Sequence, residues 1–199
     1  MKTNFFEAVE NRRSIYAIGK AKTVSEDRVR EIVEFAVKHV PSPFNSQSGR
    51  VLILFGKHSS KFWDFTRQAL KKIVPADAFK TTEERIASFD AGYGTILFFE
   101  DQAVIDGLIE KFATYKDKFP VWSLQSNGML EFAIWTALES EGLGASLQHY
   151  NPLVDADIVN EWKIPTSWKL VAEMPFGSVV APAGVKEFSP TESRIKVFA

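Results

Sequence analysis

Arg12, Arg13 and Ser14 are the first residues whose types and spacing suit a chemical role, and they directly follow a short amphipathic helix pattern. Two adjacent guanidinium groups and a hydroxyl group offer forked N–H donors and positive charge, which suit a phosphate or an anionic ring. The same cations in the last turn of a helix would also complement the helix dipole without binding any ligand. These three residues alone leave both interpretations open.

A polar loop over residues 41–49 offers a second set of groups, set between a helix pattern and a strand pattern. Asn45, Ser46, Gln47 and Ser48 are neutral and can both donate and accept hydrogen bonds, as recognition of a heterocycle edge requires. A simple loop that ends the helix with Asx and Ser turns has the same composition. Both interpretations of this loop also remain open.

The composition excludes several kinds of catalysis. The 199 residues contain no cysteine, so thiolate nucleophiles, disulfides and Cys-ligated zinc are excluded, and redox chemistry would have to come from a cofactor. The histidines, His39, His58 and His149, show no metal-ligand spacing, and the sequence has no nucleophile elbow or phosphate-binding loop. We therefore expect neither a metal site nor a dedicated catalytic side chain.

Charge and hydropathy argue against two classes of partner. Lys and Arg number 24 against 25 Asp and Glu, a formal net charge of −1, which provides no field for nucleic acid. The most apolar run, residues 95–99, is far shorter than the ~20 residues of a membrane-spanning helix. The amino-terminal segment has scattered charges and no apolar stretch typical of a secretory signal. We expect a cytoplasmic protein with no membrane partner.

Helix and strand patterns follow one another along the chain. Thr23 and Glu26 have the spacing of a capping box, which predicts a helix over 25–39 that Pro41 ends. Continuous apolar runs at 51–55 and 94–99 predict strands buried on both faces. Further patterns predict helices over 62–73, 81–88, 104–112, 129–138 and 155–162, strands over 145–149 and 169–174, and an irregular tail from residue 182. No repeat or linker divides the chain, which predicts a single α+β domain over residues 1–199, with a sheet covered by helices.

The chain resembles the nitroreductase family in four segments. These are ENRRSIY near the start, PSPFNSQSGR after the first long helix, GLGASLQHYNP after the last long helix, and the stretch from Lys186 to Arg194. They occur in the family's order over essentially the whole chain, and RRS and PSPFNSQ are the most specific. The resemblance is closer to the short branch of fatty-acid-repression-mutant-like proteins.

This resemblance implies a fold, a cofactor and a set of site residues. The fold would have a central, mostly antiparallel sheet covered by helices, and the protein would be a domain-sharing homodimer in which both subunits contribute to each FMN. The implied site residues are Arg12, Arg13 and Ser14 at the cofactor, Asn45 and Gln47 from the partner subunit, Leu147, Gln148 and His149 against the isoalloxazine ring, and Lys186 and Arg194 near the phosphate.

The function that the resemblance implies is a two-step hydride transfer. NADH or NADPH would reduce FMN and leave, and a nitroaromatic or quinone acceptor would then oxidise the reduced flavin. Leu147 to Tyr150 replace the Pro-Ile-Glu-Gly turn that presents a backbone N–H to the flavin in the better-known branch of the family. This departure supports an alternative, a flavin-binding regulatory or stress-response protein with little turnover. Histidine titrates near neutral pH, which makes His149 a candidate proton donor, although such a residue more often packs or forms hydrogen bonds.

Overall fold

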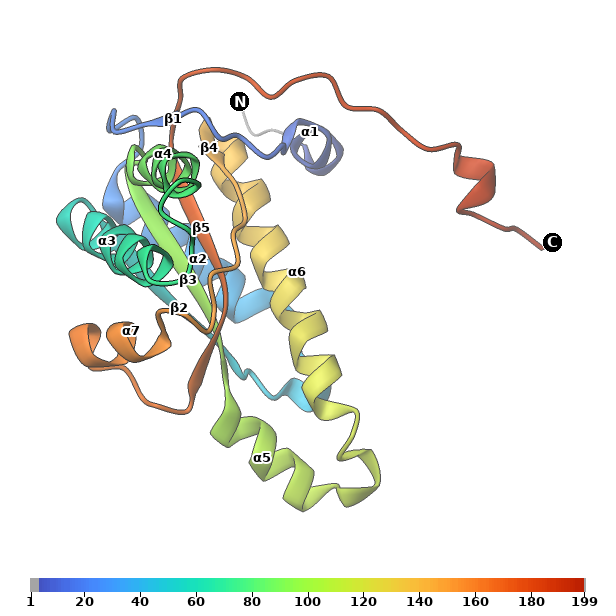
Figure 1. The fold of residues 1–199 in the computed structure, drawn as a ribbon. Helices are drawn as coiled ribbons and strands as arrows, with labels where there is room; N and C mark the ends of the chain where they lie inside the picture. Colours follow the sequence, from blue (N-terminus) through green and yellow to red (C-terminus); the bar gives the residue numbers. More distant parts are fainter. Residues whose placement is uncertain (1–3, 199) are drawn as a thin grey trace.

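A five-stranded sheet forms the centre of the protein in the computed structural model, which describes residues 4–198 (Figure 1). Every pairing between its strands is antiparallel, which confirms the sheet expected from the sequence. β4 pairs with β5, outside the path β1-β5-β3-β2 that orders the other strands. The strands are β1 (Ile18–Gly19), β2 (Gly49–Phe55), β3 (Gly94–Asp101), β4 (Leu143–Ala145) and β5 (Trp168–Val179).

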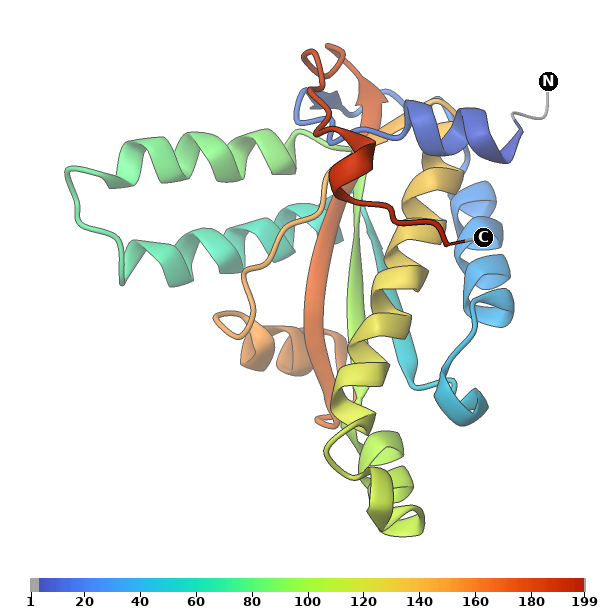
Figure 2. The ribbon, with the colours of Figure 1, turned by 90° about the vertical axis from the view of Figure 1, so that its right-hand side faces the viewer.

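Helices cover both faces of this sheet, as Figures 1 and 2 show, and the expected α+β class is confirmed. On one face, α2 and α6 form a core with the inward residues of β3 and β5, and on the other face α3, α4 and α7 form a second core. The seven helices of the described residues are α1 (Phe5–Asn11), α2 (Glu26–His39), α3 (Lys57–Lys71), α4 (Phe79–Asp90), α5 (Gln102–Lys111), α6 (Phe119–Ser140) and α7 (Asp155–Trp162). Short 3-10 turns are η1 (Pro43–Asn45), η2 (Ala113–Tyr115) and η3 (Thr191–Ser193).

Strand β3 alternates between the two cores. Ile96 and Phe98 face α2 and α6, whereas Leu97 and Phe99 face the opposite core, so the strand is buried on both faces as predicted. The same prediction is wrong for β2, because β2 lies at the end of the strand order and most of its side chains are only half-buried. A free strand edge therefore remains along β2.

Two sequence predictions are shifted for identifiable reasons. Ser25, rather than Thr23, is the N-cap of α2, since its hydroxyl oxygen accepts the backbone N–H of Arg28 at 3.1 Å. The strand predicted over 145–149 is β4, which ends at Ala145. Pro175 of β5 lies beside Ser146 and has no N–H to donate, so the pair of ladder bonds at this point is incomplete.

Helix α6 is 22 residues long and runs the length of the sheet (Figure 2). It begins at Phe119, nearly three turns before the predicted start at residue 129, because Ser123 and Ser126 look polar in the sequence but bond to carbonyl oxygens of the same helix. Pro120 is tolerated in its first turn, where its missing N–H is not needed. No helix of residues 4–198 combines the length and apolarity needed to cross a bilayer.

The carboxyl-terminal tail leaves the sheet after Val179 and extends away from the body of the chain (Figure 1). Its apolar side chains are not covered: Val185 is 99% exposed and Phe198 is 95% exposed. The tail is irregular apart from η3, as the sequence predicts.

Candidate cofactor site

Arg12, Arg13 and Ser14 follow the end of α1 and run beside β4. Ser14 forms a parallel bridge with Ala145, and the Ile15 N–H donates to the Ala145 carbonyl oxygen at 2.9 Å. Gly144 permits this close approach, since a Cβ there would lie 2.7 Å from Cγ2 of Ile15. The segment from Arg12 to Ser14 is thus fixed against the strand that leads into Leu147.

The side chain of Arg12 is half-buried against the carboxyl-terminal half of α6. Its guanidinium carbon lies 4.3 Å from the centre of the Trp135 ring. Its Nε is buried and has no hydrogen-bond partner among the described residues. Burial, and secondarily the positive charge of Arg13, lower the pKa of Arg12. A buried guanidinium N–H without an acceptor is costly unless a ligand satisfies it.

Arg13 joins this segment to the tail, because its Nη2 donates to the Gly184 carbonyl oxygen at 2.8 Å. Between the two segments lies a hollow of about 550 Å³ that we name the basic hollow. Three of its lining residues, Arg12, Arg13 and Lys186, are cations, and no acidic residue lines it. Such a surface suits an anion. The full lining is Arg12, Arg13, Ser14, Tyr16, Ala17 and residues 181–186.

Leu147, Gln148 and His149 continue from β4 along the edge of β5 that faces away from β3. Leu147 is half-buried against the core beneath α6. The backbone of Gln148 pairs with that of Glu173 in both directions, at 2.7 and 2.9 Å. His149 is exposed. Because this segment follows β4 directly and Ser14 bridges to Ala145 of β4, the two predicted segments belong to one region.

Asn45 and Gln47 lie in a distorted loop. Phe44, Asn45 and Gln47 all have left-handed backbone angles, with φ of 55°, 51° and 48°. The loop is held by its own bonds, among them one from the Gln47 N–H to the Ser42 hydroxyl oxygen at 2.9 Å. Left-handed conformations of bulky residues are strained and concentrate at functional sites. The side chains of Asn45 and Gln47 are exposed.

The loop lies at the opposite end of α6 from Arg12. Phe44 contacts the rings of Phe119 and Trp122, with centroids 5.4 and 6.4 Å away, whereas Arg12 contacts Trp135. Trp122 and Trp135 are 13 residues apart on one helix, which corresponds to about 20 Å at 1.5 Å per residue. Within one chain, Asn45 and Gln47 are therefore not brought to the basic hollow.

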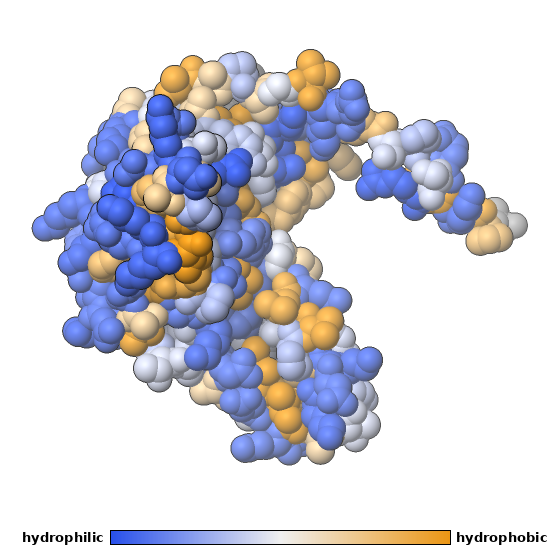
Figure 3. All heavy atoms as spheres, in the orientation of Figure 1, coloured by the Kyte–Doolittle hydropathy of each residue, from blue (hydrophilic) through white to orange (hydrophobic). Residues whose placement is uncertain are grey.

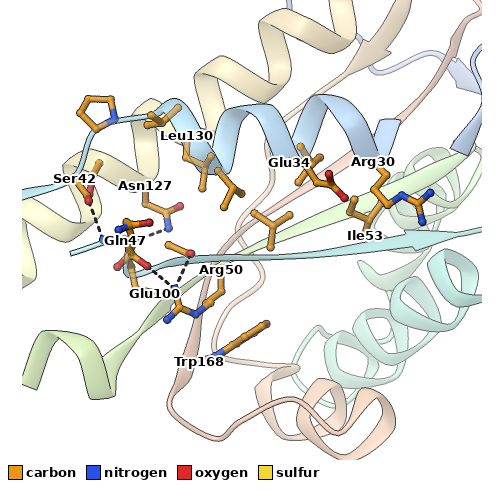
Figure 4. A pocket seen from close by; sticks show the side chains of 17 residues that line it. Arg30, Glu34, Ser42, Gln47, Arg50, Ile53, Glu100, Asn127, Leu130 and Trp168 are labelled. Carbon is orange, nitrogen blue, oxygen red and sulfur yellow. Dashed lines mark hydrogen bonds between the residues drawn. The ribbon is translucent and has the colours of Figure 1, made fainter. Parts of the chain in front are cut away.

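A second depression, of about 480 Å³, lies between α2, β2 and α6 (Figure 4). Glu100 at its base is 4% exposed, and its Oε1 accepts a bond from Nδ2 of Asn127 at 2.8 Å. The other carboxyl oxygen, Oε2, has no partner among the described residues, and burial raises the pKa of Glu100. Arg50 at the rim forms a 3.0 Å ion pair with Asp101. This depression is separate from the basic hollow.

Lys186 and Arg194, the two tail residues predicted near the phosphate, lie in different parts of the tail. Lys186 lines the basic hollow, with its Nζ 5.1 Å from the centre of the Phe188 ring. Arg194 follows η3 at the far end of the tail and does not line the hollow of its own chain. Both side chains are exposed.

Three residues of this region were not predicted from the sequence. Trp135 contacts Arg12, and Glu131 one turn earlier on α6 is largely buried. Glu173 of β5 is fully buried. Burial raises the pKa of Glu131 to about 7 and that of Glu173 to about 8. A glutamate within a strand and one within a helix carry no signal of burial in the sequence. Among residues 4–198, no group of three His, Asp or Glu side chains could hold a metal ion.

Comparisons with known proteins identify the family. Residues 9–178 match the Nitroreductase family. Nitroreductase FRM2 of Saccharomyces cerevisiae is 32% identical over 187 residues, which are 93% of this chain and 93% of FRM2. The structure of nitroreductase CinD from Lactococcus lactis in complex with chloramphenicol is 46% identical, with a TM-score of 0.90 over 98% of this chain and 100% of CinD; CinD has also been solved with 4-nitrophenol.

A more distant structure, from Exiguobacterium sibiricum and in complex with FMN, is 16% identical with a TM-score of 0.70 over 98% of each chain, and it shows the fold alone. The match of the family over most of the chain and the identity with FRM2 and CinD are stronger findings. On these grounds the chain belongs to the nitroreductase family.

Proposed function

We propose that this chain binds FMN in the basic hollow and acts as an FMN-dependent NAD(P)H oxidoreductase, as a single domain over residues 1–199. The observation that carries the proposal is the buried Nε of Arg12, which has no partner in the described residues and lies in a hollow lined by three cations and no acid. The phosphate and the anionic reduced ring of FMN would satisfy these charges. The FMN bound to the Exiguobacterium sibiricum protein of the same fold supports the choice of cofactor.

The protein's own residues bind and orient this cofactor. Bound FMN would supply hydride chemistry, accepting hydride from NADH or NADPH and passing electrons to an acceptor. Arg12 and Arg13 place positive charge where the flavin gains negative charge, and Ser14 adds a hydroxyl donor. Leu147, Gln148 and His149 form the surface against the ring. No side chain is needed as a dedicated acid or base.

A homodimer completes the site in this proposal. The loop with Asn45 and Gln47 lies about 20 Å along α6 from Arg12, so it would serve the flavin of the partner subunit. Hydrophobic residues gather on the hollowed side of the molecule, over α6 and below α1 and the tail (Figure 3). Exposed apolar side chains of this kind mark interaction surfaces. On α6 they are Val121, Leu124, Met129 and Phe132.

The proposed acceptors are nitroaromatic compounds and quinones. CinD, which is 46% identical, has been solved with chloramphenicol and with 4-nitrophenol, two nitroaromatic compounds. We propose a two-step reaction, in which the nicotinamide donor would leave before a flat acceptor enters the same site. We place this activity in the cytoplasm, with no nucleic acid partner.

The visible absorption spectrum of the purified protein tests the proposal. FMN is added in excess and removed by gel filtration, and we expect about one retained flavin per subunit. NADH or NADPH should then bleach the flavin band, and 4-nitrophenol or a quinone should restore it. A protein that retains no flavin after this treatment would exclude the proposed function.

A matched pair of variants locates the cofactor. Arg12→Ala should weaken FMN binding at least tenfold, because a buried charge-assisted bond contributes about 1.5–3 kcal/mol. Arg67→Ala on α3 removes another half-buried arginine, one that pairs with Asp64 away from the basic hollow, and this variant should bind FMN as the wild type does. Equal FMN affinity in both variants would place the cofactor elsewhere.

A further inference from the structure

Glu173 occupies an unusual position for a carboxyl group. It lies in the middle of β5, opposite Leu97 of β3, and its side chain is fully buried among the residues of the α3, α4 and α7 face. Neither its backbone nor its carboxyl group lines the basic hollow. A buried carboxyl group is costly, so its contacts indicate what it does.

Glu173 holds the segment that follows β4 from two sides. Its backbone N–H and carbonyl oxygen both pair with Gln148, at 2.9 and 2.7 Å. Both of its carboxyl oxygens accept the backbone N–H of Tyr150, at 3.2 and 3.0 Å. His149 lies between these two fixed residues and is exposed. Glu173 thus fixes the segment through its backbone and its side chain, two residues along β5 from Pro175, which has no N–H to donate.

The groups around this carboxyl are mostly acidic. Glu131 of α6 and Asp155 of α7 both act on Glu173 with like charge, and the Tyr150 N–H is the donor that favours its ionised form. Two cations act on the neighbours of Glu173 and not on Glu173 itself. Burial raises the pKa of Tyr150, and the charge of Arg85 of α4 opposes this rise. Burial likewise raises the pKa of Asp155, and the charge of Lys169 of β5 opposes that rise. Glu173 forms no ion pair among the described residues. Its charge is therefore expected to change within the neutral to mildly alkaline range.

We propose that Glu173 is the positioning residue of the cofactor-facing segment Leu147–Tyr150, fixing the backbone on both sides of His149 from within the sheet. This inference rests on the proposed function, because it assigns that segment to the flavin. An ionised carboxylate accepts a stronger hydrogen bond than a protonated one. The Tyr150 amide is thus held more tightly as pH rises, and the backbone position of the preceding residue, His149, becomes better fixed.

We call the hydrogen bonds that the Glu173 carboxyl group accepts from the Tyr150 N–H the clamp. Amide hydrogen exchange at Tyr150 tests the clamp directly, in the full chain with and without added FMN. In the wild type we expect the protection factor of this amide, taken relative to amides in the centre of β3 that exchange by global unfolding, to rise between pH 6 and pH 9. Glu173→Gln keeps an acceptor oxygen but removes the charge, so its protection should persist and be independent of pH. Glu173→Ala should lower the protection at least tenfold. If Glu173→Ala does not fold, the pH profile of Glu173→Gln still decides the question.

Two further measurements separate positioning from simple stabilisation. With FMN bound, Glu173→Gln should change the pH dependence of the flavin absorbance spectrum and of kcat, with little change in KM for the acceptor. Glu100→Gln is the matched control, because Glu100 is also a buried glutamate in the sheet but lies at the separate depression beside β2. It should leave the protection of the Tyr150 amide unchanged.

The outcomes also separate this inference from the proposed function. Unchanged protection of Tyr150 in Glu173→Ala, a pH-dependent profile in Glu173→Gln, or an equal effect of Glu100→Gln would each overturn the clamp. A wild type that binds no FMN but shows the expected exchange profile would overturn the function and leave the clamp standing.

Discussion

The guanidinium group of Arg12 stacks on the ring of Trp135, with its carbon 4.3 Å from the ring centre. A cation over an aromatic face gains roughly 0.5–2 kcal/mol, depending on how far it is desolvated. We expect Trp135→Leu to free the Arg12 side chain and to weaken FMN binding by about fivefold, whereas Trp135→Phe should retain most of the affinity. Fluorescence titration of FMN measures both. Equal affinity of the Leu variant and the wild type would show that the stacking does not orient Arg12.

The bond between Arg13 and the Gly184 carbonyl oxygen is expected to hold the start of the tail. Arg13→Ala should expose this segment and speed its cleavage by trypsin at Lys186, as mass spectrometry of a timed digest would show. FMN affinity should also fall, because the basic hollow loses one of its three cations. Arg13→Lys keeps the charge and should restore FMN binding more than it restores resistance to cleavage, since the forked donor is lost.

The buried acids predict how stability depends on pH. Burial raises the pKa of Glu131 to about 7 and that of Glu173 to about 8, from 4.5, so the folded state binds protons more tightly than the unfolded state. The free energy of unfolding should therefore fall as pH rises from about 5 to about 8, by roughly 1.4 kcal/mol for each unit of pKa difference. Urea denaturation across this range measures the slope. Glu131→Gln should flatten it, and Glu110→Gln, on the surface of α5, should not.

Gly144 allows the Arg12–Ser14 segment to approach β4. Gly144→Ala would place a Cβ 2.7 Å from Cγ2 of Ile15, and we expect a loss of about 1–3 kcal/mol in stability together with weaker FMN binding. Gly107→Ala is the control, since no atom lies within 4 Å of its added Cβ in α5. It should be neutral or slightly stabilising, because alanine favours helix more than glycine does. Thermal melts of the two variants compare these effects.

The exposed apolar side chains of α6 predict where the subunits meet. Leu124→Arg should shift the protein toward monomer in light scattering after gel filtration, because an arginine on an apolar interface is left without a partner. Ile73→Arg changes an equally exposed apolar residue just beyond the end of α3, on the other side of the sheet, and should leave the oligomeric state unchanged. A wild-type protein that elutes as a monomer would contradict the homodimer.

Much of the architecture follows from local patterns in the sequence. Apolar spacing, together with capping and stop signals, identified a helix in the place of each of the seven described helices, and it identified the fully buried strand β3, because apolar spacing reports the burial of a face. The resemblance to the family, rather than any local pattern, grouped the RRS segment with residues 147–149, and the bridge from Ser14 to Ala145 brings the first segment to the strand that leads into the second. Whether these residues bind FMN stays a prediction.

Other features depend on partners that are distant in the sequence. The burial of Glu173 follows from the Tyr150 amide and the surrounding strands, and nothing near Glu173 in the sequence signals it. β4 is short because Pro175, thirty residues later, cannot complete the ladder. The half-burial of β2 reflects its place at the sheet edge, which its apolar composition does not disclose.

The separation of Asn45 from Arg12 along α6 has a consequence for mixtures of variants. If each site takes Arg12 from one chain and Asn45 from the other, two chains with different substitutions can together form one intact site. A heterodimer of Arg12→Ala and Asn45→Ala subunits would carry one site with both defects and one site with neither. Co-refolding two variants that are each impaired should therefore restore part of the activity, and this complementation would appear only when the chains exchange.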